Sequence, residues 1–130
     1  DGRAVALGPL EPEAIAGEMR RAALCIIPSR CYENFPMVLG EAFASGLPVL
    51  ASNIGALGEL VQEDRTGAKF DPFNPDSMTR TIDAAFADPH RLARWGATAR
   101  EHYEKHLTTA ETTNQQTLIY RSLTGDGATA

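Results

Sequence analysis

The stretch AALCIIPSRCYENFPMVLGEAFASGLPVLA, residues 22–51, decides the fold of this 130-residue chain. It opens on an uninterrupted apolar run at 22–27 and closes on a second run at 48–51. Between them lie a polar loop and a helical segment that starts at Pro36 and ends before Gly46. Two apolar runs joined by a helix are typical of neighbouring strands in a parallel sheet, and the first run is expected to be covered on both faces.

Strand and helix signals alternate on both sides of this unit. Two more short strands are predicted, at 3–7 and 68–70. Helices are predicted at 11–21, 56–61, 76–87, 91–106 and 108–123. This alternation predicts an α/β fold: a Rossmann-like parallel sheet of four strands with flanking helices, followed by C-terminal helices.

Composition narrows the classes of function. Lys and Arg number 12 against 17 Asp and Glu, a formal net charge of −5, which argues against nucleic acid or an anionic membrane as the partner. Hydrophobic residues at 43% and charged residues at 22% fit one globular domain. We expect no transmembrane segment and no secretory leader, and a chain that begins at Asp1 is interpreted as a processed product or an excised fragment.

The remaining single-residue signals are weak. Cys25 and Cys31 are expected to be free thiols in a reducing cytosol, with a reactive Cys31 as the alternative. His102 and His106 have metal-ligand spacing on a predicted helix, but are interpreted as solvated histidines, and no metal site is predicted. Trp95 lies on an apolar stripe and is expected in the core. No Gly-x-Gly-x-x-Gly fingerprint is present.

Ligands of such sheets bind at the carboxyl ends of the strands, which directs attention to the loops 28–36 and 52–56. The helix after the first loop should present the unpaired N–H groups of Met37, Val38 and Leu39, an anion-binding arrangement. Glu33 precedes that helix, and Glu41 lies eight positions later, about one turn into it. Glu41 could accept hydrogen bonds from two ribose hydroxyls. The alternative is that Glu33 is a helix-terminus acid and Glu41 a solvated helix residue.

An ordered set of residues makes the chain recognisable from about residue 5 to residue 123. The set comprises Pro28-Ser29, Glu33, Glu41, the run AFASGLPV at 42–49, Gly55, Glu59 and Thr66-Gly67. It resembles the donor-binding, C-terminal half of retaining glycosyltransferases of the GT-B fold, in the large family four, or group 1, that uses nucleotide sugars.

The resemblance implies roles by position. Glu33 matches the glutamate beside the donor sugar that is needed for catalysis. Glu41 matches the glutamate that binds the ribose hydroxyls. The loop whose backbone N–H groups bind sugar hydroxyls and diphosphate is matched by Asn34, Phe35, Pro36 and Met37, and Val38 continues the helix start.

Two residues depart from the family pattern, Asn34 where Gly is common and Gly58 where Pro is common. Asn tolerates the left-handed region, so the turn can survive. The basic pair that binds the diphosphate in the family has no match here, and Arg30 is not expected to replace it.

The resemblance implies that residues 1–124 form part of a nucleotide-sugar-binding domain, with a disordered tail at 125–130. The donor would be a UDP-, GDP- or ADP-hexose, with no cofactor, and an acceptor-binding N-terminal domain would lie outside the chain. This fragment alone is expected to be inactive and able to dimerise through a face left uncovered. The implied location is cytoplasmic, with the periphery of the inner membrane as a variant for the full-length enzyme.

Three alternatives remain open at this stage. One is a nucleotide-sugar epimerase of the same architecture. The second is a non-catalytic module that keeps the GT-B fold but has lost donor binding, against which the presence of Glu33 and Glu41 argues. The third is an unrelated doubly wound regulatory domain, to which the spacing of these two glutamates is poorly suited.

Overall fold

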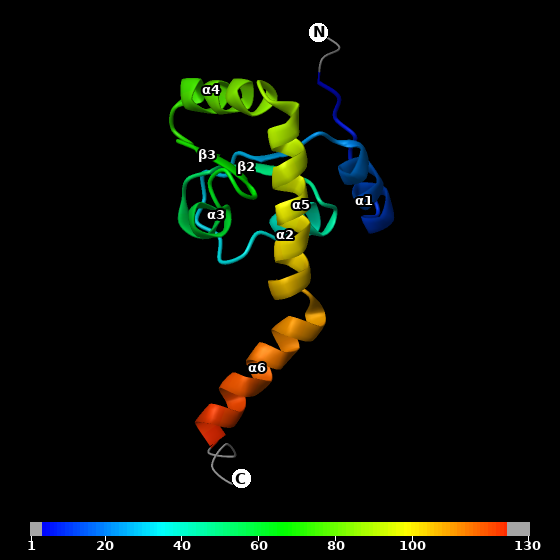
Figure 1. Cartoon of the computed structure of the whole chain (residues 1–130), viewed down its shortest axis with the longest axis vertical. Helices are drawn as coiled ribbons and strands as arrows, with labels where there is room; N and C mark the ends of the chain where they lie inside the picture. The colour runs from blue at the N-terminus through cyan, green and yellow to red at the C-terminus, as the bar shows by residue number, and fades with distance from the viewer. Residues whose placement is uncertain (1–3, 125–130) are drawn as a thin grey trace.

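The computed structural model describes residues 4–124, so Arg3 and the predicted tail at 125–130 lie outside the described residues. Figure 1 shows the arrangement of the elements along this part of the chain. In order they are α1 (Pro12–Arg21), β1 (Cys25–Ile27), α2 (Met37–Ala44), β2 (Val49–Ser52), α3 (Gly55–Leu60), β3 (Gly67–Phe70), α4 (Pro75–Phe86), α5 (Pro89–His106) and α6 (Thr109–Thr124). The predicted α/β class and the C-terminal helices are confirmed.

The sheet is parallel, in the order β1-β2-β3, and Leu50 is in register with Ile26 on one side and Ala68 on the other. All four residues of the central strand β2 are buried. Because side chains alternate along a strand, β2 contributes to two hydrophobic clusters, one on each face of the sheet. Val49 and Ala51 join the cluster of α2 and α3, whereas Leu50 joins the cluster that contains Phe70 and Trp95. Helices therefore cover both faces of the strand next to the predicted site.

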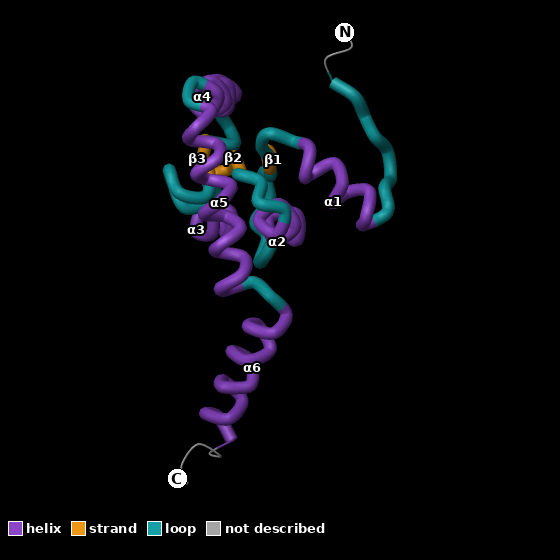
Figure 2. Tube along the Cα trace, turned by 45° about the vertical axis from the view of Figure 1, so that its right-hand side comes forward, coloured by secondary structure: helices purple, strands orange, loops and turns teal. Residues whose placement is uncertain are grey.

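Helix α5 ties the two clusters together. Trp95 packs in the cluster around Leu50, while Ala99, about one turn later, packs in the cluster around Phe43 of α2. Figures 1 and 2 show α5 running past the sheet and α2, and α6 continuing away from them. Within 4–124 the structure contains no helix long and apolar enough to span a membrane.

The ends of α2 follow from the local sequence. The helix starts after Pro36, which is the N-cap residue with φ −73°. It ends in a Schellman motif, in which the Gly46 N–H donates to the Phe43 carbonyl at 3.0 Å and the Leu47 N–H to the Ala42 carbonyl at 2.9 Å. Gly46 has φ +68°, as predicted for a residue just past a helix end. This turn delivers the chain directly into β2.

Two expectations about the sheet are wrong. The predicted strand at 3–7 is absent, since its described part, 4–7, is exposed and forms no strand. A strand exists through hydrogen bonds to a neighbour, and no described segment pairs with these residues. The run at 22–27 forms a strand only over Cys25–Ile27, and it is covered on one face: Ile27 is buried, whereas Ile26 on the other face is 38% exposed.

Candidate functional site

The predicted site residues lie where the parallel sheet predicts, at the carboxyl ends of the strands. The loop after β1 leads into α2, and the loop after β2 leads into α3. The segment after β3, beginning at Asp71, reaches the same edge and leads into α4. Only the first two loops were predicted to carry the site, although the same rule, applied to the strand at 68–70, indicates the third.

The loop after β1 is organised around Ser29. Its Oγ donates to Oε1 of Glu33 at 3.1 Å and accepts from the backbone N–H of Cys31 at 3.3 Å. These bonds give the exposed Glu33 a defined anchor at the end of β1. Ser29 was part of the recognised pattern, but its contact with Glu33 is visible only in the structure.

Tyr32 joins the loop after β1 to the loop after β2. A Cβ placed on Gly55 would lie 3.1 Å from Cδ1 of Tyr32, so the tyrosine ring rests against the Gly55 backbone. Gly55 has φ +51°, a conformation in which a side chain is strained. The approach of the two loops therefore depends on the absence of a side chain at residue 55.

The start of α2 keeps the predicted anion-binding character in part. The helix has no side-chain cap, and Met37 is exposed beside the first turn. The expectation of three unpaired N–H groups is wrong for Leu39, whose N–H donates to the Pro36 carbonyl at 3.0 Å. A bond of this i to i+3 type tightens the first turn and removes one donor. The N–H groups of Met37 and Val38 precede the first intrahelical bond and remain the donors at this terminus.

Glu41 lies on the exposed side of α2 and lines a hollow of about 250 Å³. Phe35 and Met37 contribute to the same hollow, as do Tyr103 of α5 and Leu107 beyond it. The Phe35 ring lies against Gly40, where a Cβ would be 3.5 Å away. The hollow thus offers one carboxylate among apolar side chains, next to the α2 terminus. Glu33 is not among the residues that line it.

The other predicted residues are placed as follows. Asn34 is exposed between Glu33 and Phe35, Pro36 is buried and Val38 is half-buried. Arg30 lines a smaller hollow with Asp71 and Met78, and Glu33 and Glu41 do not line that hollow. Cys25 and Cys31 are free thiols, and burial raises the pKa of Cys25.

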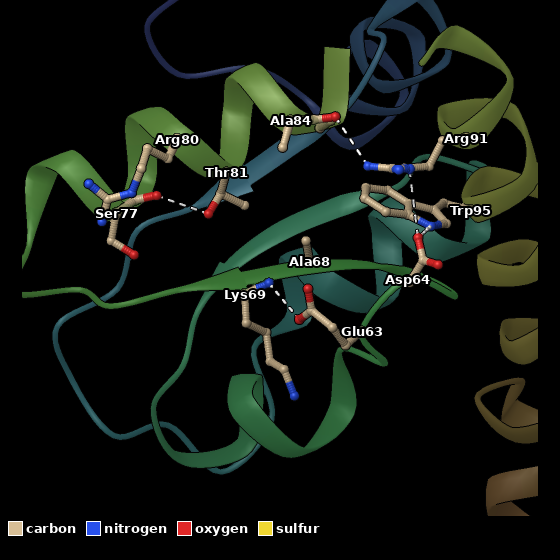
Figure 3. A pocket seen from close by; sticks show the side chains of 11 residues that line it. Glu63, Asp64, Ala68, Lys69, Ser77, Arg80, Thr81, Ala84, Arg91 and Trp95 are labelled. Atoms are coloured by element: carbon tan, nitrogen blue, oxygen red, sulfur yellow. Dashed lines mark hydrogen bonds and ion pairs between the residues drawn. The ribbon is translucent and has the colours of Figure 1, made fainter. Parts of the chain in front are cut away.

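A separate hollow of about 410 Å³ lies between α4, the start of α5 and β3, away from the predicted residues (Figure 3). Asp64 Oδ1 accepts from the Trp95 indole N–H at 3.2 Å and lies 3.7 Å from Nε of Arg91. Arg91 also donates to the Ala84 carbonyl at 3.2 Å. These contacts join the turn before β3 to α5, and α5 to α4.

His102 and His106 of α5 lie side by side, with ring centroids 4.9 Å apart. Burial, the neighbouring His106 and the charge of Arg65 lower the pKa of His102. No group of three or more His, Cys, Asp or Glu side chains suited to a metal ion occurs within residues 4–124.

Superposition on solved structures identifies the fold. Sucrose-phosphate synthase from Thermosynechococcus elongatus superposes with a TM-score of 0.85 at 30% identity, covering 96% of this chain and 31% of that protein. Anabaena HepE in complex with UDP superposes with a TM-score of 0.73 at 26% identity, covering 83% and 29%. The C-terminal domain of a group 1 glycosyltransferase from Francisella tularensis superposes with a TM-score of 0.70 at 19% identity, covering 79% and 53%. The chain therefore has the fold of the C-terminal half of GT-B enzymes.

Sequence comparison gives the family. A D-inositol 3-phosphate glycosyltransferase from Gordonia bronchialis is 37% identical over 99 residues, which are 76% of this chain and 21% of that protein. The chain thus spans about a fifth of the length of this relative. The family model described as glycosyl transferases group 1 matches residues 3–102. On this match, which covers most of the chain, the protein belongs to the group 1 glycosyltransferase family.

Proposed function

We propose that this chain is the donor-binding domain of a retaining glycosyltransferase, which moves a hexosyl group from a nucleoside diphosphate sugar to an acceptor hydroxyl. The observation that carries the proposal is the uncapped start of α2, with Glu33 anchored just before it and Glu41 in a hollow one turn later. An anion-binding helix terminus beside a carboxylate that can accept from a diol suits a nucleoside diphosphate.

Each residue then has a role. The N–H groups of Met37 and Val38 bind the diphosphate, and those of Asn34 and Phe35 bind hydroxyls of the sugar. Pro36 has no N–H, and contributes the fixed φ that starts the helix. The Glu41 carboxylate accepts hydrogen bonds from the ribose. Glu33 lies beside the transferred sugar and acts as the catalytic residue.

In the proposed reaction, this domain stabilises the leaving diphosphate. Negative charge develops on the diphosphate as the sugar departs, and preoriented N–H groups at a helix terminus stabilise it without reorganising. Relatives span a much longer chain, so we infer that transfer needs a further, acceptor-binding domain. The 130-residue chain should therefore bind donor without transferring sugar. The two free thiols support a cytoplasmic location.

Uracil is the proposed base. HepE, at 26% identity, has been crystallised with UDP and with UDP-glucose, which supports this choice. UDP, GDP and ADP should each be titrated into the isotope-labelled chain, with the amide signals of Met37 and Val38 as the NMR readout. We expect UDP to shift these signals most.

The matched variants are Glu41→Gln and Glu13→Gln. Glu41→Gln removes the charge in the hollow, whereas Glu13→Gln makes the same change at an exposed position of α1. UDP binding should weaken about tenfold in Glu41→Gln, as expected for a lost charge-assisted hydrogen bond. It should be unchanged in Glu13→Gln. Equal affinity of both variants for UDP would contradict the assigned role of Glu41.

A further inference from the structure

A second hollow opens at the carboxyl edge of the sheet and belongs to none of the roles assigned above. Its volume is about 440 Å³, within the usual range of small-molecule sites of about 300–1,000 Å³. Tyr32 from the loop after β1, Asn53 from the loop after β2 and Phe73 from the segment after β3 all line it. Three separate loops therefore converge on one space.

Two exposed aromatic rings line this hollow. Tyr32 is 82% exposed and Phe73 is 69% exposed. Exposed rings of this size at the wall of a concavity are typical of ligand contact surfaces, because an apolar ligand face can cover them. The Tyr32 ring rests on Gly55, and the backbone of Phe73 is fixed by its N–H, which donates to Oδ1 of Asp71 at 2.9 Å.

The polar groups of the hollow suit an uncharged, hydroxyl-rich ligand. Its charged lining consists of one cation, Lys69, and one anion, Asp71, and Lys69 Nζ already donates to the Gly58 carbonyl at 3.0 Å. Within residues 4–124, the Asn53 side chain forms no hydrogen bond, so it offers both donors and an acceptor to hydroxyl groups. With one cation and one anion, this lining carries no net charge that would attract a phosphate.

The position of the hollow favours a sugar over a nucleobase as its ligand. Tyr32 directly precedes Glu33, while the hollow assigned to the ribose begins at Phe35 and extends to Glu41. With diphosphate at the start of α2 and ribose at Glu41, the base extends away from Glu33, and the Tyr32 side faces the sugars. Resting on the proposed function for this orientation, we propose that the Tyr32–Phe73 hollow is a saccharide subsite that binds a pyranose ring of the acceptor.

The subsite would bind a sugar by the two contacts usual for saccharides, stacking on aromatic rings and hydrogen bonds to hydroxyl groups. The apolar C–H face of the pyranose packs on the rings of Tyr32 and Phe73, and its hydroxyls bond to the Asn53 amide and the Asp71 carboxylate. The subsite would let the donor domain itself hold part of the acceptor.

The test is an NMR titration of the 130-residue chain with methyl α-glucopyranoside and methyl α-mannopyranoside, each to about 100 mM. At least one of the two glycosides should shift the NMR signals of the Asn53 side-chain amide and of the backbone of residues 71–73. In Phe73→Ala, affinity should fall about fivefold, the scale expected for losing one ring face. Phe86→Ala is the matched control, because Phe86 is also exposed but does not line this hollow.

The outcomes separate the subsite from the proposed function. The subsite is supported if a pyranoside shifts these signals and its affinity falls only in Phe73→Ala. This holds whether or not UDP shifts the amide signals of Met37 and Val38. Absence of any shift, or equal weakening in both variants, overturns it. Shifts at Phe73 caused by UDP and not by a pyranoside also overturn it, and identify a base platform. Pyranoside binding together with no UDP binding contradicts the proposed function alone.

Discussion

Gly55 fixes the geometry between the loops that follow β1 and β2. A side chain at this residue would be strained at φ +51° and would press on Tyr32. We expect Gly55→Ala to lower the free energy of unfolding by about 1–2 kcal/mol, the usual cost of a left-handed alanine. Urea unfolding measures the loss, and the NMR signals of the Tyr32 ring should move.

Gly17 is the matched control for Gly55. It lies inside α1 with open space around its Cα, so alanine there should stabilise the helix by about 0.5–1 kcal/mol. If both glycine variants were destabilised equally, the φ of Gly55 would not be the cause.

His102 makes stability depend on pH. Its pKa is lowered in the folded state by burial, His106 and Arg65, so the folded chain binds fewer protons than the unfolded chain. The corresponding stability is present above the unfolded pKa of about 6.5 and is lost as the pH falls through that value toward the folded pKa. Urea unfolding at pH 7.5 and at pH 5 should therefore show a fall that His102→Asn reduces.

His90 provides the comparison for His102. It lies exposed near the start of α5, and His90→Asn should leave the pH dependence as it is in the unmodified chain. A profile that flattened equally in both variants would assign the effect to overall charge.

At the scale of elements, Trp95 holds the turn before β3 against α5. The side chain is buried, and its indole N–H donates to Asp64, which has φ +55° at the tip of the turn. Trp95→Phe removes the donor and part of the ring. We expect the free energy of unfolding to fall by about 2 kcal/mol from the lost hydrogen bond and the small cavity.

Asp64→Asn separates the two contributions to the Trp95 effect. It keeps an oxygen acceptor for the indole, so calorimetry should find a much smaller change than in Trp95→Phe. A loss as large in Asp64→Asn would mean that the carboxylate charge near Arg91 dominates.

Local signals predicted most element boundaries. Pro36 and Gly46 bracket α2 as predicted. The side-chain caps were not predicted: Asn74 caps α4 through bonds to Asp76 and Ser77, and Asp88 caps α5, which begins at Pro89 and not at 91. Caps and turns depend on neighbours in the chain, so the sequence carries them directly. The predicted strand at 3–7 failed because a strand needs a partner that the residues themselves do not specify.

The places in the fold of the candidate site residues follow from the sequence, but their side-chain contacts do not. Glu33 and Glu41 lie at the expected edge of the sheet, because a parallel topology places loop and helix start there. The bonds that organise the site, Ser29 to Glu33 and Tyr32 against Gly55, depend on side-chain rotamers and loop conformation. The segment after β3, from which Asp71 and Phe73 line a hollow at this edge, was not predicted.

For the whole molecule, α6 leaves an apolar surface exposed. Leu118, Ile119, Tyr120 and Leu123 are each more than half exposed on this helix. Apolar side chains gathered in this way favour association, so sedimentation velocity should detect self-association of the chain as its concentration rises. The double variant Ile119→Glu and Leu123→Glu should reduce it.

Gln116 supplies the control for α6. Gln116→Glu adds a negative charge at an exposed polar position of the same helix and should leave association largely unchanged. Association that persisted in the double variant would place the contact elsewhere on the chain.

The two edges of the sheet are not equivalent. At β3, the Lys69 N–H donates to the Glu63 carboxylate at 3.0 Å and the Gly67 carbonyl accepts from the Asp64 N–H at 2.9 Å. At β1, no strand within 4–124 pairs with the outer edge. Exposed strand edges are templates for further strands. The turn before β3 thus occupies part of the β3 edge, whereas the outer edge of β1 offers backbone groups to which a further strand can pair.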